Sequence, residues 1–135
     1  MSRKARILVV EDDSGIREII RTRLRMMGHE VAVARTGREA LTQIRAWRPD
    51  AMVLDINMPE LDGFGVLSSF ADDRATLPPT LVITARNAAE DVRKAVSLGA
   101  KDYLAKPFSE AQLQSRIARL LRFMPPEGGP RVLLV

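Results

Sequence analysis

The sequence predicts an α/β fold: a five-stranded parallel sheet, doubly wound, with helices on both faces. Two observations support this prediction. Five short apolar runs alternate along the chain with longer segments in which apolar residues recur every three or four positions. Buried strands that alternate with amphipathic helices are typical of βαβ units, whose strands are parallel. The 135 residues suit a single domain.

The predicted strands are continuous apolar runs rather than alternating ones. This pattern is expected where helices cover both faces of a sheet, because side chains on either side of the strand are then buried. The five runs are Ile7–Val10, Val31–Ala34, Ala51–Leu54, Leu81–Ile83 and Tyr103–Ala105.

The first predicted helix starts after Asp13, which suits a helix N-terminus because an acidic side chain is stabilised by the helix dipole. It ends at Gly28, which can adopt the left-handed conformation of a helix stop. Its inner face is predicted to hold Ile16, Ile19, Ile20, Leu24 and Met27, and its outer face Arg17, Arg21 and Arg25. His29 follows in a turn, has no partner histidine or cysteine nearby, and is predicted to be a surface residue.

Capping residues predict where the later helices begin. Thr36 with Glu39 and Ser109 with Gln112 have capping-box spacing, and Asn87 is a good N-cap for the fourth helix. The third helix is predicted at residues 65–70, after a turn at Asp62-Gly63. The predicted inner residues are Ala40, Leu41, Ile44 and Trp47 in the second helix and Leu113, Ile117, Leu120 and Leu121 in the fifth.

Composition excludes several classes of protein. The chain has no cysteine, which excludes disulfides and thiolate metal sites. No apolar run approaches the ~20 residues of a membrane span, and the N-terminus lacks the features of a signal peptide. These features favour a cytoplasmic protein without membrane contact. The net charge is +4, but basic residues are spread along the chain, so we expect no direct nucleic-acid binding by this domain.

Polar side chains follow the ends of four predicted strands. Glu11 and Asp12 follow the first strand, Asp55 the third, Thr84 the fourth and Lys106 the fifth. The carboxyl ends of parallel strands meet at one edge of the sheet, where ligands bind in folds of this class. We therefore expect these five side chains to form one site.

The residue types of this site suit phosphoryl transfer to a carboxylate. Grouped carboxylates repel one another, and a hard cation with oxygen ligands, Mg²⁺, relieves the repulsion. Asp55 is the candidate nucleophile, which would form an acyl phosphate. Lys106 would pair with a phosphoryl oxygen and Thr84 would donate a hydrogen bond to another.

Five segments, in order and in register, resemble the signature segments of response-regulator receiver domains. They are Val9–Asp13, Leu54–Pro59, Leu61–Gly63, Ile83–Ala85 and Gly99–Phe108, within a likeness that spans about residues 6–122. The resemblance implies a flavodoxin-like sheet with strand order 2-1-3-4-5. It also implies two-component signal transduction, in which the domain is a phosphoprotein of a phosphorelay rather than an enzyme acting on other substrates.

The resemblance assigns a role to each site residue. Asp12 and Asp55 would be direct Mg²⁺ ligands, Glu11 would act through water, and Asn57 would contribute its backbone carbonyl. Asp55 would be the phosphoacceptor. Thr84 and Lys106 would be the switch hydroxyl and lysine, and Tyr103 the switch aromatic. The resemblance further implies a cis peptide bond between Lys106 and Pro107.

The expected phosphodonor is a phosphohistidine on a sensor histidine kinase or a histidine phosphotransfer protein. Phosphorylation would change the face formed by the fourth helix, the fifth strand and the fifth helix, through which a homodimer or another partner could bind. Asp102 and Arg116 match charged dimer residues of the DNA-binding branch of the family, whereas Lys101 and Gln112 depart from that pattern.

We expect residues 1–122 to form the receiver domain and residues 123–135 to form a linker and the start of a following segment or truncated next domain. One alternative is a degenerate receiver that acts as a phosphorylation-independent interaction module. A dehalogenase-type phosphatase would need an Asp-x-Asp motif after the first strand, and a nucleotide or flavin binder would need a glycine-rich loop there; the sequence has neither. Arg86 is a further candidate, for control of water access to the phosphoryl group.

Overall fold

Five parallel strands form one sheet in the order β2-β1-β3-β4-β5, as the sequence predicted. The computed structural model describes residues 4–85 and 88–124. The strands are β1 (Arg6–Val10), β2 (Glu30–Ala34), β3 (Ala51–Asp55), β4 (Thr80–Thr84) and β5 (Asp102–Ala105). Each lies within one residue of the predicted run at both ends.

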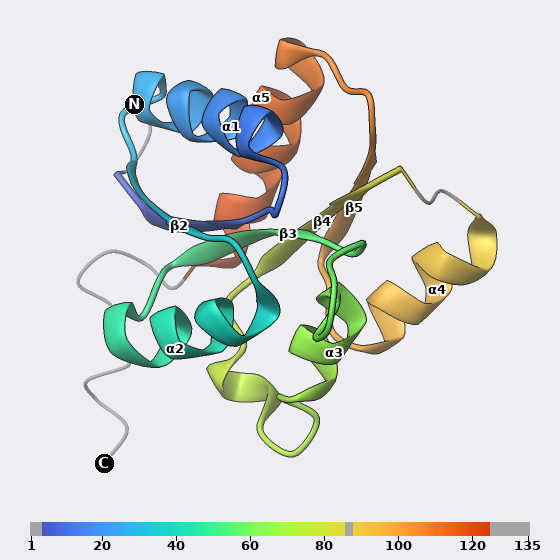
Figure 1. Cartoon of the computed structure of the whole chain (residues 1–135). Coiled ribbons are helices and arrows are strands. Elements are labelled where there is room, and N and C mark those ends of the chain that lie inside the picture. Colours follow the sequence, from blue (N-terminus) through green and yellow to red (C-terminus); the bar gives the residue numbers. More distant parts are fainter. Residues whose placement is uncertain (1–3, 86–87, 125–135) are drawn as a thin grey trace.

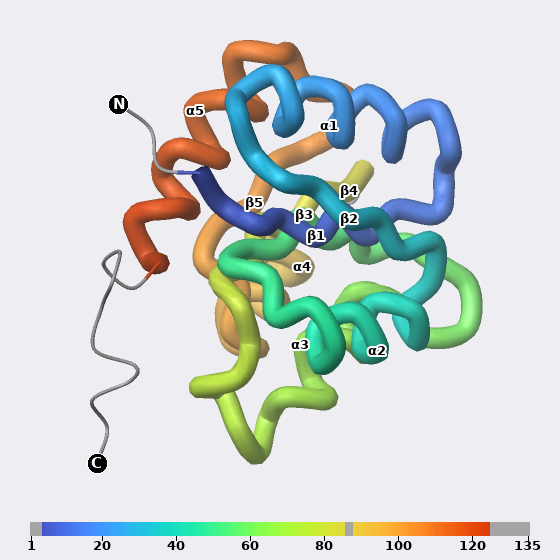
Figure 2. Tube along the Cα trace, turned by 90° about the vertical axis from the view of Figure 1, so that its left-hand side faces the viewer, coloured from blue at the N-terminus to red at the C-terminus, as the bar shows by residue number. Residues whose placement is uncertain are grey.

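Helices cover both faces of the sheet (Figures 1 and 2). One face carries α1 (Ser14–Met26) and α5 (Glu110–Leu120), and the other α2 (Gly37–Trp47), α3 (Gly63–Ser68) and α4 (Ala89–Ser97). Short 3₁₀ helices cover Arg74–Thr76 and Leu121–Phe123. Alternate side chains of β1 enter opposite cores: Leu8 and Val10 face α2, whereas Ile7 and Val9 face α1 and α5. Burial on both faces explains why the strands read as continuous apolar runs.

Most predicted helix ends are confirmed. The Thr36 hydroxyl accepts a hydrogen bond from the Glu39 amide, and Ser109 and Gln112 form a complete capping box. Gly28 has a φ of 95°, the left-handed conformation expected of a helix stop. Asp13 is the N-cap of α1.

Two helices begin elsewhere than predicted. The Asp62 carboxylate accepts a hydrogen bond of 2.8 Å from the Gly65 amide, so Asp62 is an N-cap and α3 begins at Gly63 rather than at Gly65. The N-cap of α4 is Ala88. The predicted cap, Asn87, lies outside the described residues.

The predictions for Ile19 and His29 are wrong. Ile19 is 58% exposed, because the buried stripe of α1 follows Ile16, Ile20 and Leu24 and leaves Ile19 on its edge. His29 is only 6% exposed. Its Nδ1 accepts a hydrogen bond of 3.0 Å from the amide of Ala5, so the imidazole belongs to the contact between the starts of β1 and β2.

The described chain extends two residues past Arg122, the predicted end of the domain. Met124 is buried in the core cluster of α1 and α5, two residues beyond the predicted domain end at Arg122. The rest of the predicted linker, residues 125–135, lies outside the described residues. Trp47 packs against the core between the sheet and α2, as predicted. The Arg6 guanidinium lies 4.6 Å from the centre of its ring. Within the described ranges, no helix has the length and apolar character needed to cross a membrane.

Candidate functional site

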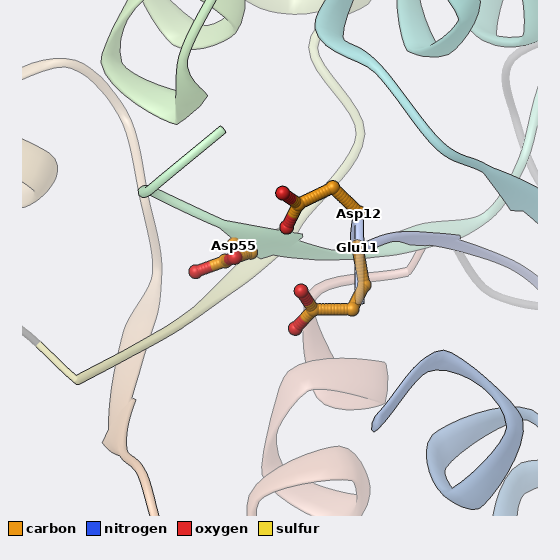
Figure 3. Close-up of side chains that lie close together, drawn as sticks. All are labelled: Glu11, Asp12 and Asp55. Atoms are coloured by element: carbon orange, nitrogen blue, oxygen red, sulfur yellow. The ribbon is translucent and has the colours of Figure 1, made fainter. Parts of the chain in front are cut away.

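Three carboxylates meet at the carboxyl edge of the sheet. β1 and β3 are hydrogen-bonded neighbours, and Val10 is paired with Leu54, so the residues that follow are adjacent. Glu11 and Asp12 extend from the end of β1 and Asp55 from the end of β3 (Figure 3). One carboxylate oxygen from each lies within 4.8 Å of the others. The convergence predicted from the strand ends is therefore present.

The three acids differ in exposure. The Glu11 and Asp55 side chains are buried, at 1% and 3% exposed, whereas Asp12 is exposed at the rim. One oxygen of Glu11 accepts a hydrogen bond of 3.2 Å from the Asp13 amide. The Asp13 carboxylate instead accepts from the Ile16 amide at 2.9 Å, which uses this acid as a helix cap, as predicted.

Lys106 lies between the two buried acids. Its Nζ is 2.7 Å from Glu11 Oε1 and 3.4 Å from Asp55 Oδ2. The predicted pairing of Lys106 with a phosphoryl oxygen stays a prediction, and the shorter of its two contacts is with Glu11. Burial alone would lower the pKa of Lys106, yet its hydrogen bond to Glu11 and the charges of both acids outweigh that effect and raise the pKa. Lys106 is therefore a firm cation at neutral pH.

Burial makes the charged form of Glu11 unfavourable. Burial raises its pKa to about 7, the hydrogen bond from Lys106 opposes this effect, and the neighbouring Asp55 charge adds to it. One lysine does not balance two buried carboxylates and a third at the rim. A divalent cation would supply the missing positive charge, and an all-oxygen donor set suits Mg²⁺. The residues present therefore fit the expected metal.

The remaining predicted residues surround the acids. The backbone amide of Asn57 donates a hydrogen bond of 3.3 Å to Asp55 Oδ1, while the Asn57 side chain is exposed. Thr84 is fully buried at the end of β4, and its carbonyl accepts from the Lys106 amide at 2.9 Å. The peptide bond between Lys106 and Pro107 is cis, as the resemblance implied.

Two further predicted residues lie away from the acids or outside the described structure. Tyr103 is half-buried on β5, against the core of α2, α3 and α4. Arg86 lies outside the described residues.

Sequence reasoning missed two residues beside the site. Arg17 was assigned to the outer face of α1, but its guanidinium contacts the carbonyls of Glu11 and Asp12. Leu61 fits against Gly37 and Gly65, where a Cβ atom would approach atoms of Leu61 to within 2.4 and 2.5 Å respectively. The available signals were weak: a basic residue near the start of α1, and two glycines, one at the start of α2 and one within α3.

The fold and the site define a doubly wound parallel α/β domain with an acidic cluster at the carboxyl edge of its sheet, and comparison with known proteins identifies its family. The chain belongs to the response regulator receiver domain family, which it matches over residues 7–118. Response regulator MprA of Mycolicibacterium vanbaalenii is 46% identical over 127 residues, covering 92% of this chain and 53% of that protein. Probable transcriptional regulator ycf27 of Cyanophora paradoxa is 44% identical over 119 residues, covering 88% of this chain and 49% of that protein. The chain thus spans about half the length of these relatives.

Solved structures show the same architecture. Chemotaxis protein CheY4 of Vibrio cholerae superimposes with a TM-score of 0.81 at 31% identity, covering 88% of this chain and all of that one. The receiver domain of Francisella response regulator 1452 gives a TM-score of 0.81 at 32% identity, covering 88% and 98% of the two chains. The protein is therefore a receiver domain of a two-component system.

Proposed function

We propose that Asp55 accepts a phosphoryl group from a phosphohistidine donor in the presence of Mg²⁺. The observation that carries the proposal is the placement of Asp55, a buried carboxylate within reach of two further acids and one lysine. The donor is a sensor histidine kinase or a histidine phosphotransfer protein. The domain acts as a phosphoacceptor and removes its own phosphoryl group, without turning over another substrate.

In the proposed transfer, an oxygen of the Asp55 carboxylate forms a bond to phosphorus, and the phosphorus–nitrogen bond to the donor histidine breaks with its electron pair left on the imidazole. When bound, Mg²⁺ supplies charge neutralisation for the acids and the incoming oxygens. Its ligands would be Asp12, Asp55 and the Asn57 carbonyl, with Glu11 acting through water. Lys106 pairs with a phosphoryl oxygen, which balances negative charge as it accumulates.

The proposed output is a change at the face formed by α4, β5 and α5. Thr84, at the end of β4, donates to a phosphoryl oxygen, and Tyr103 on β5 responds by a change of rotamer. These movements shift the population between two states of that face, which binds a partner or an effector. The names of the longer relatives suggest that the output is transcriptional; in that case DNA binding belongs to a segment other than this domain.

A homodimer through this face remains one form of the proposal. Asp102 Oδ1 lies 3.3 Å from Arg116 Nη1, and Asp102 Oδ2 lies 3.4 Å from Arg119 Nη2, within the same chain. A dimer that uses these charges would have to exchange the internal pairs for pairs between chains. The Asp102 side chain is only 12% exposed, so pairs between chains would have to offset the cost of breaking its internal pairs.

The proposal is tested by incubation with acetyl phosphate, with and without Mg²⁺, and measurement of intact mass. The chain should gain one phosphoryl group only with Mg²⁺, and Asp55→Asn should gain none. Asp50→Asn is the matched control, since Asp50 lies before β3, accepts from the Arg6 amide, and should leave phosphorylation intact. No gain by the chain, while a known receiver is modified in parallel, would favour a phosphorylation-independent interaction module. A gain that survives Asp55→Asn would reject Asp55 as the acceptor.

A further inference from the structure

The side chain of Arg17 folds back from α1 onto the loop that carries the acid pair. Its Nη1 donates hydrogen bonds to the carbonyl of Glu11 at 3.0 Å and to that of Asp12 at 3.4 Å. Arg17 is the fourth residue of α1, where a cation is unfavourable because the helix N-terminus is itself positive. The hydrogen bonds to the two carbonyls offset the unfavourable interaction of the guanidinium with the positive end of the helix.

The rest of the loop is held through other atoms. The Glu11 amide donates to the Ala34 carbonyl at 3.1 Å, and the Asp13 amide donates to the Glu11 carboxylate. Within residues 4–85 and 88–124, no hydrogen bond or ion pair holds the Asp12 carboxylate. Its direction therefore depends on the backbone at residues 11–13, and Arg17 holds two carbonyls of that backbone.

We propose that Arg17 is a positioning residue for the cation site. By bridging the two carbonyls, it fixes the backbone from which the Glu11 and Asp12 carboxylates converge on Asp55. Groups that orient metal ligands without touching the metal are a general feature of metal sites, and their loss weakens binding. The inference rests on the proposed function in one respect, namely that these carboxylates bind Mg²⁺.

Positioning and charge make opposite predictions for Arg17. The guanidinium is a positive charge close to a cation site, so loss of the charge alone would tighten Mg²⁺ binding. Loss of the carbonyl contacts would loosen the loop and weaken binding. Arg21 provides the matched control, because it lies one turn further along α1 and pairs with Glu18 at 3.0 Å instead of with the loop.

The test measures Mg²⁺ binding by isothermal titration calorimetry at pH 8 for the chain and for Arg17→Met, Arg17→Lys and Arg21→Met. Both Arg17 variants should bind Mg²⁺ about tenfold more weakly, the lower end of the range for groups that support metal ligands. Arg17→Lys keeps the charge, but its side chain is one bond shorter than the arginine side chain up to Nη1, the atom that contacts both carbonyls, so it should not restore binding. Arg21→Met should bind as the parent does.

A second readout separates positioning from a general loss of structure. In phosphorylation by acetyl phosphate, the half-saturating Mg²⁺ concentration of the Arg17 variants should rise by the same factor, while the rate at saturating Mg²⁺ returns to within about twofold of the parent. Reduced folding would instead lower the plateau and leave the half-saturating concentration unchanged. If Arg17→Met does not fold, the comparison is made with Arg17→Lys alone.

Two results would overturn the inference. If the chain binds Mg²⁺ and the Arg17 variants bind it equally or more tightly, Arg17 does not position the site, and the proposed function stands. If the chain itself binds no Mg²⁺ at millimolar concentrations, the metal role in the proposed function fails and the inference fails with it.

Discussion

Replacement of Glu11 by glutamine should remove the pH dependence that this residue imposes on stability. Burial and the nearby Asp55 charge raise the pKa of Glu11 from 4.5 to about 7. The folded chain therefore holds a proton that the unfolded chain has lost between these two values. The contribution of Glu11 protonation to the free energy of unfolding is therefore complete below pH 4.5 and is lost as the pH rises through about 7.

The magnitude follows from the two pKa values. A difference of one pH unit corresponds to about 1.36 kcal/mol, so a shift from 4.5 to about 7 is worth about 3 kcal/mol as an upper figure. Glutamine keeps the size of Glu11 and does not ionise. Relative to the parent, Glu11→Gln should therefore gain up to about 3 kcal/mol in free energy of unfolding between pH 4.5 and pH 8.

The assay is urea unfolding of the metal-free protein in EDTA, followed by the fluorescence of Trp47 at half-unit steps across this range. The difference between variant and parent reports the titration of Glu11 together with its coupling to Lys106 and Asp55, because the titrations of more distant groups are common to both. Glu18→Gln is the control, since the Glu18 side chain is 59% exposed and carries no burial penalty. A difference curve that stays flat or falls with rising pH would refute the reasoning.

Two further predictions concern backbone packing and the buried histidine. A Cβ at Gly63 would lie 2.5 Å from the Asp55 carbonyl oxygen, so Gly63→Ala should destabilise the fold by about 1–3 kcal/mol or more in urea unfolding. Gly15→Ala, which meets only a side-chain oxygen at 3.3 Å, should be neutral or gain up to about 1 kcal/mol. Burial lowers the pKa of His29, so its contribution is complete above pH 6.5 and is lost on acidification below it. His29→Leu should lower the free energy of unfolding by about 1–3 kcal/mol at pH 8, because the Ala5 amide loses its acceptor. The difference between variant and parent should shrink toward pH 5. A difference that stays constant with pH would contradict this account.

The strands were predictable because burial on both faces leaves a simple signal. β3 and β4 are buried at every position, so nothing but apolar or strand-end polar residues fits there. Helix faces were less predictable. The periodicity of α1 placed Ile19 inside, but the helix touches the sheet along a narrower stripe. His29 was misplaced because its burial depends on Ala5, a contact between residues 24 positions apart that no local pattern reports.

The sequence predicted which residues gather at the carboxyl ends of the strands, but it did not predict the contacts between their side chains. Parallel strands bring Glu11, Asp12, Asp55 and Lys106 to one edge whatever their rotamers, so the sequence sufficed for the constellation. It did not indicate that Lys106 lies closer to Glu11 than to Asp55, because that choice depends on side-chain conformation and on the balance of two buried charges.

The position of Lys106 connects the proposed cation site at Glu11 with the proposed phosphoryl transfer to Asp55. Lys106 Nζ lies 2.7 Å from Glu11 and 3.4 Å from Asp55, so in this arrangement its charge is directed mainly at Glu11 and less at Asp55, the proposed phosphoacceptor. Pairing with a phosphoryl oxygen on Asp55 requires Lys106 to give up part of its contact with Glu11. Glu11 would then be a buried carboxylate without its cation, which is costly. A divalent cation held by these acids would remove that cost, so in the proposed function Lys106 would be able to turn from Glu11 toward a phosphoryl group on Asp55 only when the cation site is filled.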